Sequence, residues 1–354
     1  DNLLLGSDFI TSTTGFAAYH ESSLTAGRWS FTLGIRFDNE LISMNYRNFT
    51  DSYYTAFPSD TTKNPSEVAL NIDDKGHLRR DFFEILPKFT AKYDIDTANN
   101  LYLSVAKGYK AGGFNTQMFS EVLQRRIKHY MGMYQDLDIE DIITYKPEES
   151  WNAEIGSHFS TKNARFSGDV ALFWIECFNQ QLTVFPEGQT TGRMMTNAGR
   201  TRSFGAEVSF NALLAEGLTL NGAYGYTNAR FREFKDGVND YAGNFIPYAP
   251  RNTVSATLSY TLKLKSNWLQ SITLSATGRG AGKIYWTERN DISQPFYATL
   301  DSSLRFEGKS WAVDFWAKNI TNTRYDLFYF ESMGNAFLQR ARGTSVGVRV
   351  NLDI

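Results

Sequence analysis

Apolar and polar residues alternate with a period of two along almost the whole chain. In residues 30–38, apolar side chains occupy every second position from Phe31 to Phe37. The same alternation returns in residues 203–211 and again in residues 345–352. Successive side chains of a β-strand point to opposite faces, so this period predicts strands whose two faces meet different surroundings. The chain is therefore expected to be all-β.

About thirteen segments carry this pattern, and many exceed the five or six residues typical of strands in soluble proteins. They are expected near residues 14–25, 28–47, 80–95, 100–114, 145–160, 163–183, 194–213, 217–233, 246–263, 268–287, 292–307, 310–330 and 335–352. Tight polar connections are predicted at 25–28, 96–100, 161–164, 215–217, 265–267 and 307–310, and long ones at 48–79 and 115–144.

Short turns at one end and long loops at the other are typical of an antiparallel up-and-down transmembrane β-barrel. A closed barrel is suited to a bilayer because it leaves no backbone edge unpaired. A soluble β-sandwich or propeller is the alternative, but it explains the strand lengths and the one-sided long loops less well.

Composition narrows the class of protein further. Aromatic residues make up 15% of the chain and the mean hydropathy is −0.38. No apolar run approaches the roughly 18 residues of a membrane helix. Nucleic-acid-binding proteins are usually basic, so the formal net charge of −2 excludes that class of protein. Cys177 is the single cysteine, so it is expected to be an unpaired small residue in a strand.

The direction of the first predicted strand bears on domain organisation. Residues 14–25 lead into a short turn, so they should run from the extracellular side toward the periplasm. Barrels built from a single bacterial chain normally have an even number of strands. The odd count, this direction and the lack of a signal peptide lead us to expect that residues 1–354 are the C-terminal part of a larger barrel.

Four motifs resemble the TonB-dependent outer-membrane receptor family. Residues 106–115 (AKGYKAGGFN) and 145–156 (YKPEESWNAEIG) look like two successive strand elements of these receptors. Residues 197–207 (NAGRTRSFGAE) and 317–325 (AKNITNTRY) are similar to two later elements, and the order is also that of the family. The chain departs from the family in ending with Ile354, where a Phe is usual, and in lacking a recognisable plug domain.

The resemblance implies a barrel of about 22 strands whose lumen is closed by a plug. About nine strands and the N-terminal plug domain would then lie outside this sequence. It also implies a bacterial outer-membrane protein, surrounded by lipid bilayer and lipopolysaccharide and energised by the TonB–ExbB–ExbD complex. Active uptake of an iron–siderophore or a similarly large scarce nutrient is expected, with no cofactor. The alternatives are a carbohydrate importer working with a surface lipoprotein, a haem importer and a passive porin.

The long connection 115–144 is the first candidate for ligand contact, because unstructured loops of this length are usually functional or disordered. A solvated loop that merely covers the barrel is the alternative. Its candidate residues combine positive charge with aromatic faces, as an anionic chelate would require: Arg125, Arg126, His129, Tyr130 and Tyr134. Met131 and Met133 beside His129 would suit haem or copper. The four histidines are too scattered to predict a metal site.

Two further sets of candidate residues follow from the predicted strand faces. Tyr285, Trp286 and Arg289 should lie at the extracellular rim, either in an aromatic girdle or as a surface for stacking sugars. The second set is expected to form a polar lumen lining that holds the plug, and it comprises Arg36, Glu154, Glu207 and Arg349. No Gly-x-Ser-x-Gly or His-Glu-x-x-His motif occurs, so the chain is not expected to be an enzyme.

Overall fold

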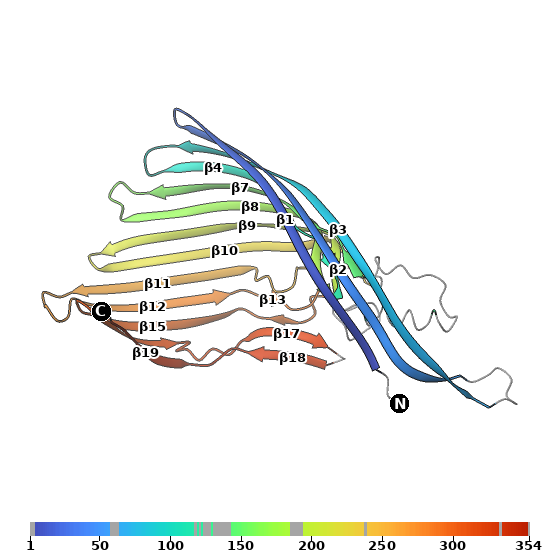
Figure 1. Ribbon diagram of the computed structural model, residues 1–354. Helices are drawn as coiled ribbons and strands as arrows, with labels where there is room; N and C mark the ends of the chain where they lie inside the picture. The colour runs from blue at the N-terminus through green and yellow to red at the C-terminus, as the bar shows by residue number, and fades with distance from the viewer. Residues whose placement is uncertain are drawn as a thin grey trace.

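A single antiparallel sheet of 13 strands dominates the computed structural model, and its strands follow one another in chain order (Figure 1). The structure describes residues 4–56, 64–116, 119, 122, 129, 143–184, 194–236, 239–332 and 335–352. The strands of the sheet are β1 (Leu4–Ala26), β2 (Trp29–Ala56), β3 (Ser66–Asp94), β4 (Asn100–Lys110), β7 (Glu148–Ser160), β8 (Phe166–Val184), β9 (Met194–Ala215), β10 (Leu218–Glu233), β11 (Asn252–Lys263), β12 (Ser271–Ala281), β15 (Tyr297–Glu307), β16 (Trp311–Lys318) and β19 (Ser345–Leu352).

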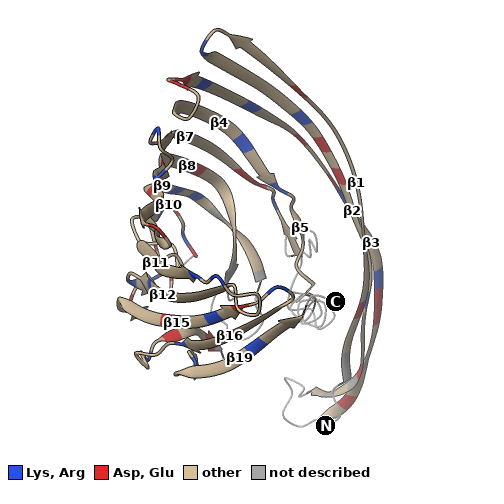
Figure 2. Cartoon of the chain, turned by 90° about the vertical axis from the view of Figure 1, so that its left-hand side faces the viewer, with Lys and Arg blue, Asp and Glu red and all other residues tan. Residues whose placement is uncertain are grey.

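The sheet curves into an open arc rather than a closed barrel. Viewed along the strands, it has a concave and a convex face, with β1 and β19 as its two edges (Figure 2). No pairing joins these two edge strands within the described part of the chain. The predicted up-and-down antiparallel architecture and the count of thirteen strands are confirmed. Among the described residues, no helix has the length and apolar character needed to cross a membrane.

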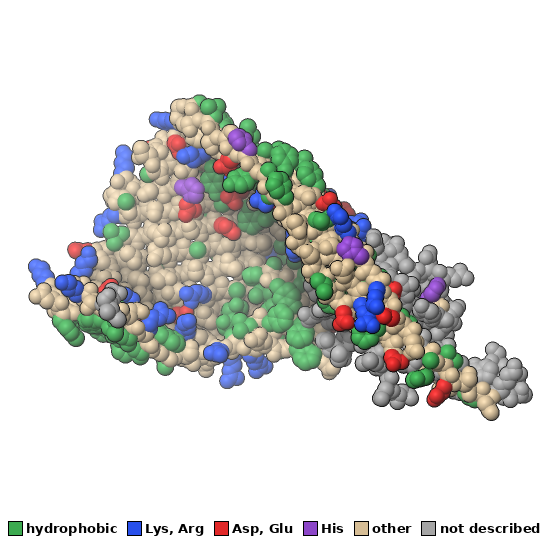
Figure 3. All heavy atoms as spheres, viewed as in Figure 1, with side chains coloured by type: hydrophobic (Ala, Val, Ile, Leu, Met, Phe, Trp, Pro, Cys, Tyr) green, Lys and Arg blue, Asp and Glu red, His purple; other side chains and the backbone are tan. Residues whose placement is uncertain are grey.

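The two faces of the sheet differ in polarity, because side chains directly opposite each other on paired strands share a face. Trp174 of β8 lies opposite Phe204 of β9, and their stacked rings have centroids 5.5 Å apart on the apolar face. On the other face, hydroxyl groups pair across β11 and β12 at about 3 Å: Thr257 with Thr277, Ser259 with Ser275, and Thr261 with Thr273. Figure 3 looks into the concave side, where acidic, basic and histidine side chains are scattered over a largely tan surface and hydrophobic side chains gather in patches.

Tight turns join the strands at one end of the sheet, as predicted. Ala26 pairs with Trp29 around Gly27, whose φ of 62° lies in the left-handed region that favours glycine. In the turn between β3 and β4, the side-chain oxygen Oδ1 of Asp96 accepts hydrogen bonds from the backbone N–H groups of Ala98 and Asn99. These donors hold the pKa of Asp96 below its ordinary value.

The predicted long loop at residues 48–79 is wrong. β2 and β3 pair continuously from Trp29 opposite Tyr93 to Ala56 opposite Ser66, so most of this stretch is strand. Its alternation is hidden in the sequence because the extension carries polar residues on both faces. Asn48, for example, is fully buried although it is polar. Without an apolar face there is no period of two to recognise.

The last two predicted strands, 310–330 and 335–352, are also wrong in extent. β16 stops at Lys318, and the chain turns at Asn319 and Asn322, both with positive φ. It then forms a separate hairpin, β17 (Asp326–Ser332) and β18 (Asn335–Arg340), before returning as β19. Two other pairs of very short strands lie outside the main sheet: β5 (Gly113–Phe114) with β6 (Thr144–Tyr145), and β13 (Ile284–Tyr285) with β14 (Ser293–Gln294).

Candidate functional site

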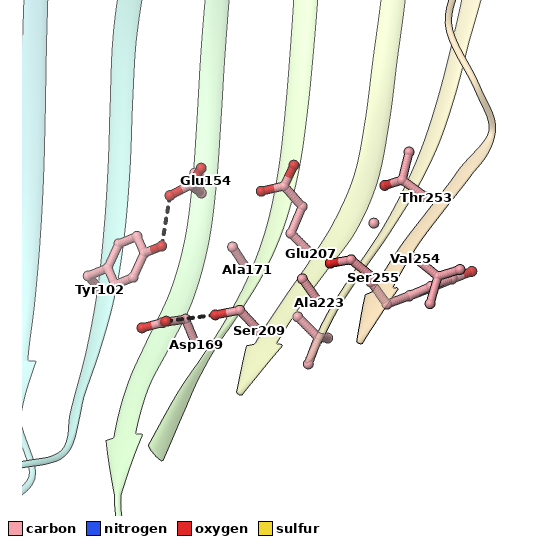
Figure 4. A pocket seen from close by; sticks show the side chains of 13 residues that line it. Tyr102, Glu154, Asp169, Ala171, Glu207, Ser209, Ala223, Thr253, Val254 and Ser255 are labelled. Carbon is pink, nitrogen blue, oxygen red and sulfur yellow. Dashed lines mark hydrogen bonds between the residues drawn. The ribbon is translucent and has the colours of Figure 1, made fainter. Parts of the chain in front are cut away.

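A hollow of about 430 Å³ lies on the concave face, over strands β4, β7, β8, β9, β10 and β11. Glu154 of β7 and Glu207 of β9, two of the predicted lumen residues, both line it (Figure 4). Asp169 of the intervening strand β8 is a third carboxylate in the lining, two residues along the strand from Ala171, which lies opposite Glu207. The structure therefore brings together two residues that lie 53 positions apart in the sequence.

A tyrosine–glycine pair positions Glu154. Tyr102 of β4 lies directly opposite Gly156 of β7, and a Cβ atom at Gly156 would come within 2.5 Å of the Tyr102 hydroxyl oxygen. The missing side chain lets the Tyr102 ring lie across the neighbouring strand and donate a hydrogen bond of 2.8 Å to Oε1 of Glu154. Sequence reasoning did not select Tyr102. The signal was the glycine two positions after the glutamate, on the same strand face.

Asp169 is held by two further polar side chains. Ser209 donates a hydrogen bond of 2.9 Å to Oδ2 of Asp169, and Nδ1 of His158 forms a short contact with Oδ1. The His158 ring in turn stacks on Tyr102 with centroids 5.2 Å apart. Serine contacts the aspartate and not the histidine, so this arrangement lacks the nucleophile-to-base hydrogen bond of a hydrolase triad.

The charge of this hollow is unbalanced. Within the described residues, neither Glu154 nor Glu207 forms an ion pair with Lys or Arg, and Asp169 has only His158 as a basic partner. Carboxylates on one concave surface repel one another and attract a basic surface that would occupy the lumen. The hollow is thus suited to binding cations or a positively charged protein surface rather than an anion.

The other two predicted lumen residues lie elsewhere on the arc. Arg36 of β2 is exposed, and its Nε lies 2.6 Å from Oδ2 of Asp38 on the same strand. Arg349 of the edge strand β19 is paired in register with Asp314 of β16. Asp314 also lies 3.2 Å from Nη1 of Arg305. Of the four predicted lumen residues, Glu154 and Glu207 therefore share a hollow, whereas Arg36 and Arg349 lie on β2 and β19.

Trp286 does not take part in an interfacial girdle, in contrast to one of the interpretations of the sequence. Its side chain is only 6% exposed and packs with Ile284 and Tyr329 in a hydrophobic cluster at the loop end of the sheet. Tyr248 covers it at a centroid distance of 5.4 Å. An indole packed in this way has no free face for sugar stacking either.

Tyr285 and Arg289 remain accessible at the same end. Tyr285 stacks on Phe245 with centroids 5.5 Å apart and an interplanar angle of 11°. Arg289 is exposed, and its guanidinium lies 3.1 Å from Asp291 and 3.9 Å from Glu331. Both residues belong to the structure at the loop end of the sheet, and neither is among the residues that line the hollow with the carboxylates. Their role in ligand binding stays a prediction.

The described part of the connection 115–144 packs on the sheet. Phe119, Val122 and Ile143 are almost completely buried against Met44, Tyr46 and Leu78 of the β2–β3 extension. Of the candidate binding residues here, His129 is described and exposed, whereas Arg125, Arg126, Tyr130 and Tyr134 lie outside the described residues. The apolar residues Phe119, Val122 and Ile143 therefore anchor this connection to the sheet. The sequence analysis did not predict this role for any residue.

The sequence analysis predicted no metal site and placed Cys177 in a strand. Across the described ranges, no three His, Cys, Asp or Glu side chains gather into a metal site. Cys177 is buried in β8, which confirms its predicted position in a strand.

An antiparallel sheet with an apolar convex face, a polar concave face and tight turns at one end is the wall of an outer-membrane β-barrel. Comparison of the sequence with known protein families identifies the family of this chain. The β-barrel of TonB-dependent receptors, described as "TonB dependent receptor-like, beta-barrel", matches residues 4–320. The chain belongs to this family.

Relatives with known names are receptors. The pesticin receptor of Yersinia enterocolitica is 25% identical over 358 residues, covering 99% of this chain and 45% of the receptor. The ferrioxamine B receptor of Salmonella typhimurium is 24% identical over 319 residues, covering 88% of this chain and 37% of that protein. The ferric yersiniabactin uptake receptor from Yersinia pestis shares the fold, with a TM-score of 0.74, 21% identity and coverage of 99% and 47%. The chain thus spans less than half the length of these relatives.

Proposed function

We propose that this chain forms part of the barrel wall of a TonB-dependent transporter that imports an iron–siderophore or a comparably large chelate. Membership of the receptor family supports the proposal, and so do the names of its relatives, which refer to ferrioxamine B and ferric yersiniabactin. In this proposal the protein performs no covalent chemistry. The TonB–ExbB–ExbD complex supplies the energy, and transport depends on a plug that opens the lumen.

The observation that carries the proposal is the uncompensated acidic surface formed by Glu154 and Glu207 on the concave face. In the assembled barrel this surface would hold a basic face of the plug domain through charge-assisted hydrogen bonds. Additional strands would pair with the free edges of β1 and β19, because an open edge is not stable in a bilayer. These strands and the plug would come from a segment that precedes residues 1–354.

Native mass spectrometry of the detergent-solubilised particle, followed by peptide mapping, tests the assembly. The expected result is a particle in which plug and additional barrel strands accompany the sequence described here, together with any ligand that is released. A closed barrel formed by this chain alone, with steady large conductance in a planar bilayer, would favour the passive porin instead. If the released ligand is an oligosaccharide or haem, the substrate is that molecule and the siderophore proposal is wrong.

The role of the acidic surface is tested separately in the complete receptor. The double variant Glu154→Gln, Glu207→Gln should loosen the plug. Passive entry of large antibiotics should then rise, and uptake of radiolabelled ferric siderophore should fall. Glu21→Gln is the control. Glu21 is exposed on β1, does not line the hollow, and lies 3.4 Å from Nζ of Lys88. Equal behaviour of the double variant and the control would show that the plug is held by other contacts.

A further inference from the structure

A strip of small, uncharged side chains runs along β10, β11 and β12 on the concave face. Its residues lie opposite one another in the strand register, so they share this face with Ala223 and Ser255 of the hollow. Every position holds glycine, alanine, serine, threonine or asparagine, and none is fully buried. We call this strip the hydroxyl corridor. It comprises the odd-numbered residues of 219–225, 253–261 and 271–277.

The hydroxyl corridor extends along the wall for about the thickness of a membrane. Thr253 and Thr261 are eight residues apart, which corresponds to about 27 Å along an antiparallel strand and is close to the roughly 25 Å apolar band of outer-membrane barrels. At the end nearer the long loops, Thr253 and Ser255 line the hollow that contains Glu207 (Figure 4). At the end nearer the tight turns, Ser271 lines a second hollow, of about 610 Å³. The corridor therefore connects two hollows.

Pairs of hydroxyl groups cross between β11 and β12 inside the corridor. Three pairs are in hydrogen-bond contact at about 3 Å: Thr257 with Thr277, Ser259 with Ser275, and Thr261 with Thr273. In each pair one hydroxyl donates, so the O–H of the other remains available to a further acceptor, and both oxygens keep a lone pair. Successive pairs are two residues apart, so these groups recur about every 7 Å. A polar molecule moving along the corridor would meet a regular series of hydrogen-bonding positions.

Charged residues border the corridor on both sides. On the side of β9, Glu207 lies opposite Gly225. On the side of β15, Asp301 lies opposite Thr277 and forms an ion pair with Arg279. Charge-assisted hydrogen bonds are roughly twice as strong as neutral ones. These flanking sectors would therefore retain a bound molecule or a plug, whereas the corridor would release it more readily.

We propose that the hydroxyl corridor is the surface along which the ligand crosses the lumen once the plug has moved. This inference rests on the transport function proposed above and assigns that transport to one sector of the wall. A neutral hydrogen bond contributes little net free energy, because it replaces a bond to water, so the ligand can exchange one hydroxyl pair for the next without being trapped. The ligand that suits this surface carries amide or hydroxyl groups on its outside and needs no net charge.

The test measures uptake by the complete receptor in cells, and the probe is a ferric trihydroxamate chelate labelled with radioactive iron. The variant removes two hydroxyl pairs without adding bulk, through Thr257→Val, Ser259→Ala, Ser275→Ala and Thr277→Val. The uptake rate should fall roughly tenfold, the factor expected when one or two neutral hydrogen bonds to the moving chelate are lost. The affinity of the receptor for the chelate should be unchanged, because the chelate is captured before it reaches the corridor.

The matched control removes the same four hydroxyl groups by type from another sector of the concave face, through Ser23→Ala, Thr32→Val, Thr90→Val and Ser104→Ala. These residues form two hydroxyl pairs, at 2.9 Å and 3.2 Å, and the strand register places them in one row with Glu154. The control should keep the full uptake rate. An unchanged rate in the corridor variant, or equal losses in both variants, would overturn the inference. If the unaltered receptor takes up no chelate, the transport proposal itself fails, and this inference with it.

A second measurement avoids any effect on folding, because the receptor is changed after it has assembled. In cells, a bulky maleimide that reaches the periplasm is attached to Ser259→Cys, and to Ser104→Cys as the control. Cys177 is buried in β8 and should not react. The labelled Ser259→Cys receptor should lose uptake, whereas the labelled Ser104→Cys receptor should retain it. Full uptake by the first, with its label confirmed by mass spectrometry, would contradict passage along the corridor.

Discussion

The side-chain amide of Asn115 forms two hydrogen bonds with the backbone of Met195. Nδ2 donates to the Met195 carbonyl oxygen at 2.8 Å, and Oδ1 accepts from the Met195 N–H at 2.6 Å. This pair joins the beginning of the connection 115–144 to the start of β9, 80 residues later in the chain. The backbone N–H of Asn115 also donates to the carbonyl of Ile143, so the two ends of the connection are held together.

Replacing Asn115 with Ala should release the base of this connection while leaving the sheet intact. Asn115 is buried, and the variant leaves a backbone N–H and a carbonyl of Met195 without partners, at a local cost of about 1–3 kcal/mol. Hydrogen exchange should accelerate in the peptides covering residues 113–116 and 194–196. Asn221→Ala on the exposed surface of β10 is the control and should change neither. Unchanged exchange in the first variant would mean that the amide does not hold the connection.

Phe119 should be the main apolar anchor of the same connection. Its ring is 1% exposed and lies 5.2 Å from Tyr46 and 6.0 Å from Phe9. A Phe→Ala change in a packed core typically lowers stability by about 3–5 kcal/mol. At Phe119 this loss should weaken the packing of the connection against the sheet. Limited proteolysis of the folded receptor should then cut within residues 116–142 much faster, whereas Tyr53→Ala, at an exposed position, should not. Resistance equal to that of the unaltered protein would contradict the packing described.

The architecture could be predicted from the sequence wherever the two faces of a strand meet different surroundings. The alternation on β9 and β19 is of this kind, and so are the tight turns such as that at Gly27. Prediction failed for the β2–β3 extension, because Asn48 and Thr50 are polar although they are buried. It also failed for β17 and β18, since a strand, a turn and a hairpin in succession carry no change of period that would separate them.

The candidate site was predictable in part for a similar reason. Glu154 and Glu207 occupy polar positions within alternating strands, so their common face follows from the period of two. Their joining with Tyr102 depends on the strand register, which places Tyr102 opposite Gly156 and cannot be read from one strand alone. The burial of Trp286 depends on contacts with Tyr248 and with Tyr329 of β17, which are distant in the sequence and leave no local pattern.

Lys107 should stabilise three neighbouring strands through two ion pairs. Its Nζ lies 2.8 Å from Glu84 of β3 and 2.7 Å from Glu149 of β7, and its side chain is largely buried. Lys107→Met leaves two carboxylates facing each other, which should lower the free energy of unfolding by about 2–3 kcal/mol, between the values for exposed and buried pairs. Adding Glu84→Gln should restore part of that loss in urea titrations. Lys88→Met, at a half-exposed pair, should cost less than about 1 kcal/mol.

The assignment of the two faces can be tested at the edge strand β19. Val348 lies opposite Phe315 on the apolar face and is exposed in this chain, whereas Ser345 lies on the other face, opposite Lys318. An arginine at Val348 should cost about 2–4 kcal/mol if the position lies near the middle of the bilayer, because the charge would enter hydrocarbon. Ser345→Arg places the same charge on the polar face and should be milder. Folding of the complete receptor into liposomes, followed by its heat-dependent mobility in gels, measures both. Equal destabilisation by the two arginines would contradict the assignment, since only one of them would face lipid.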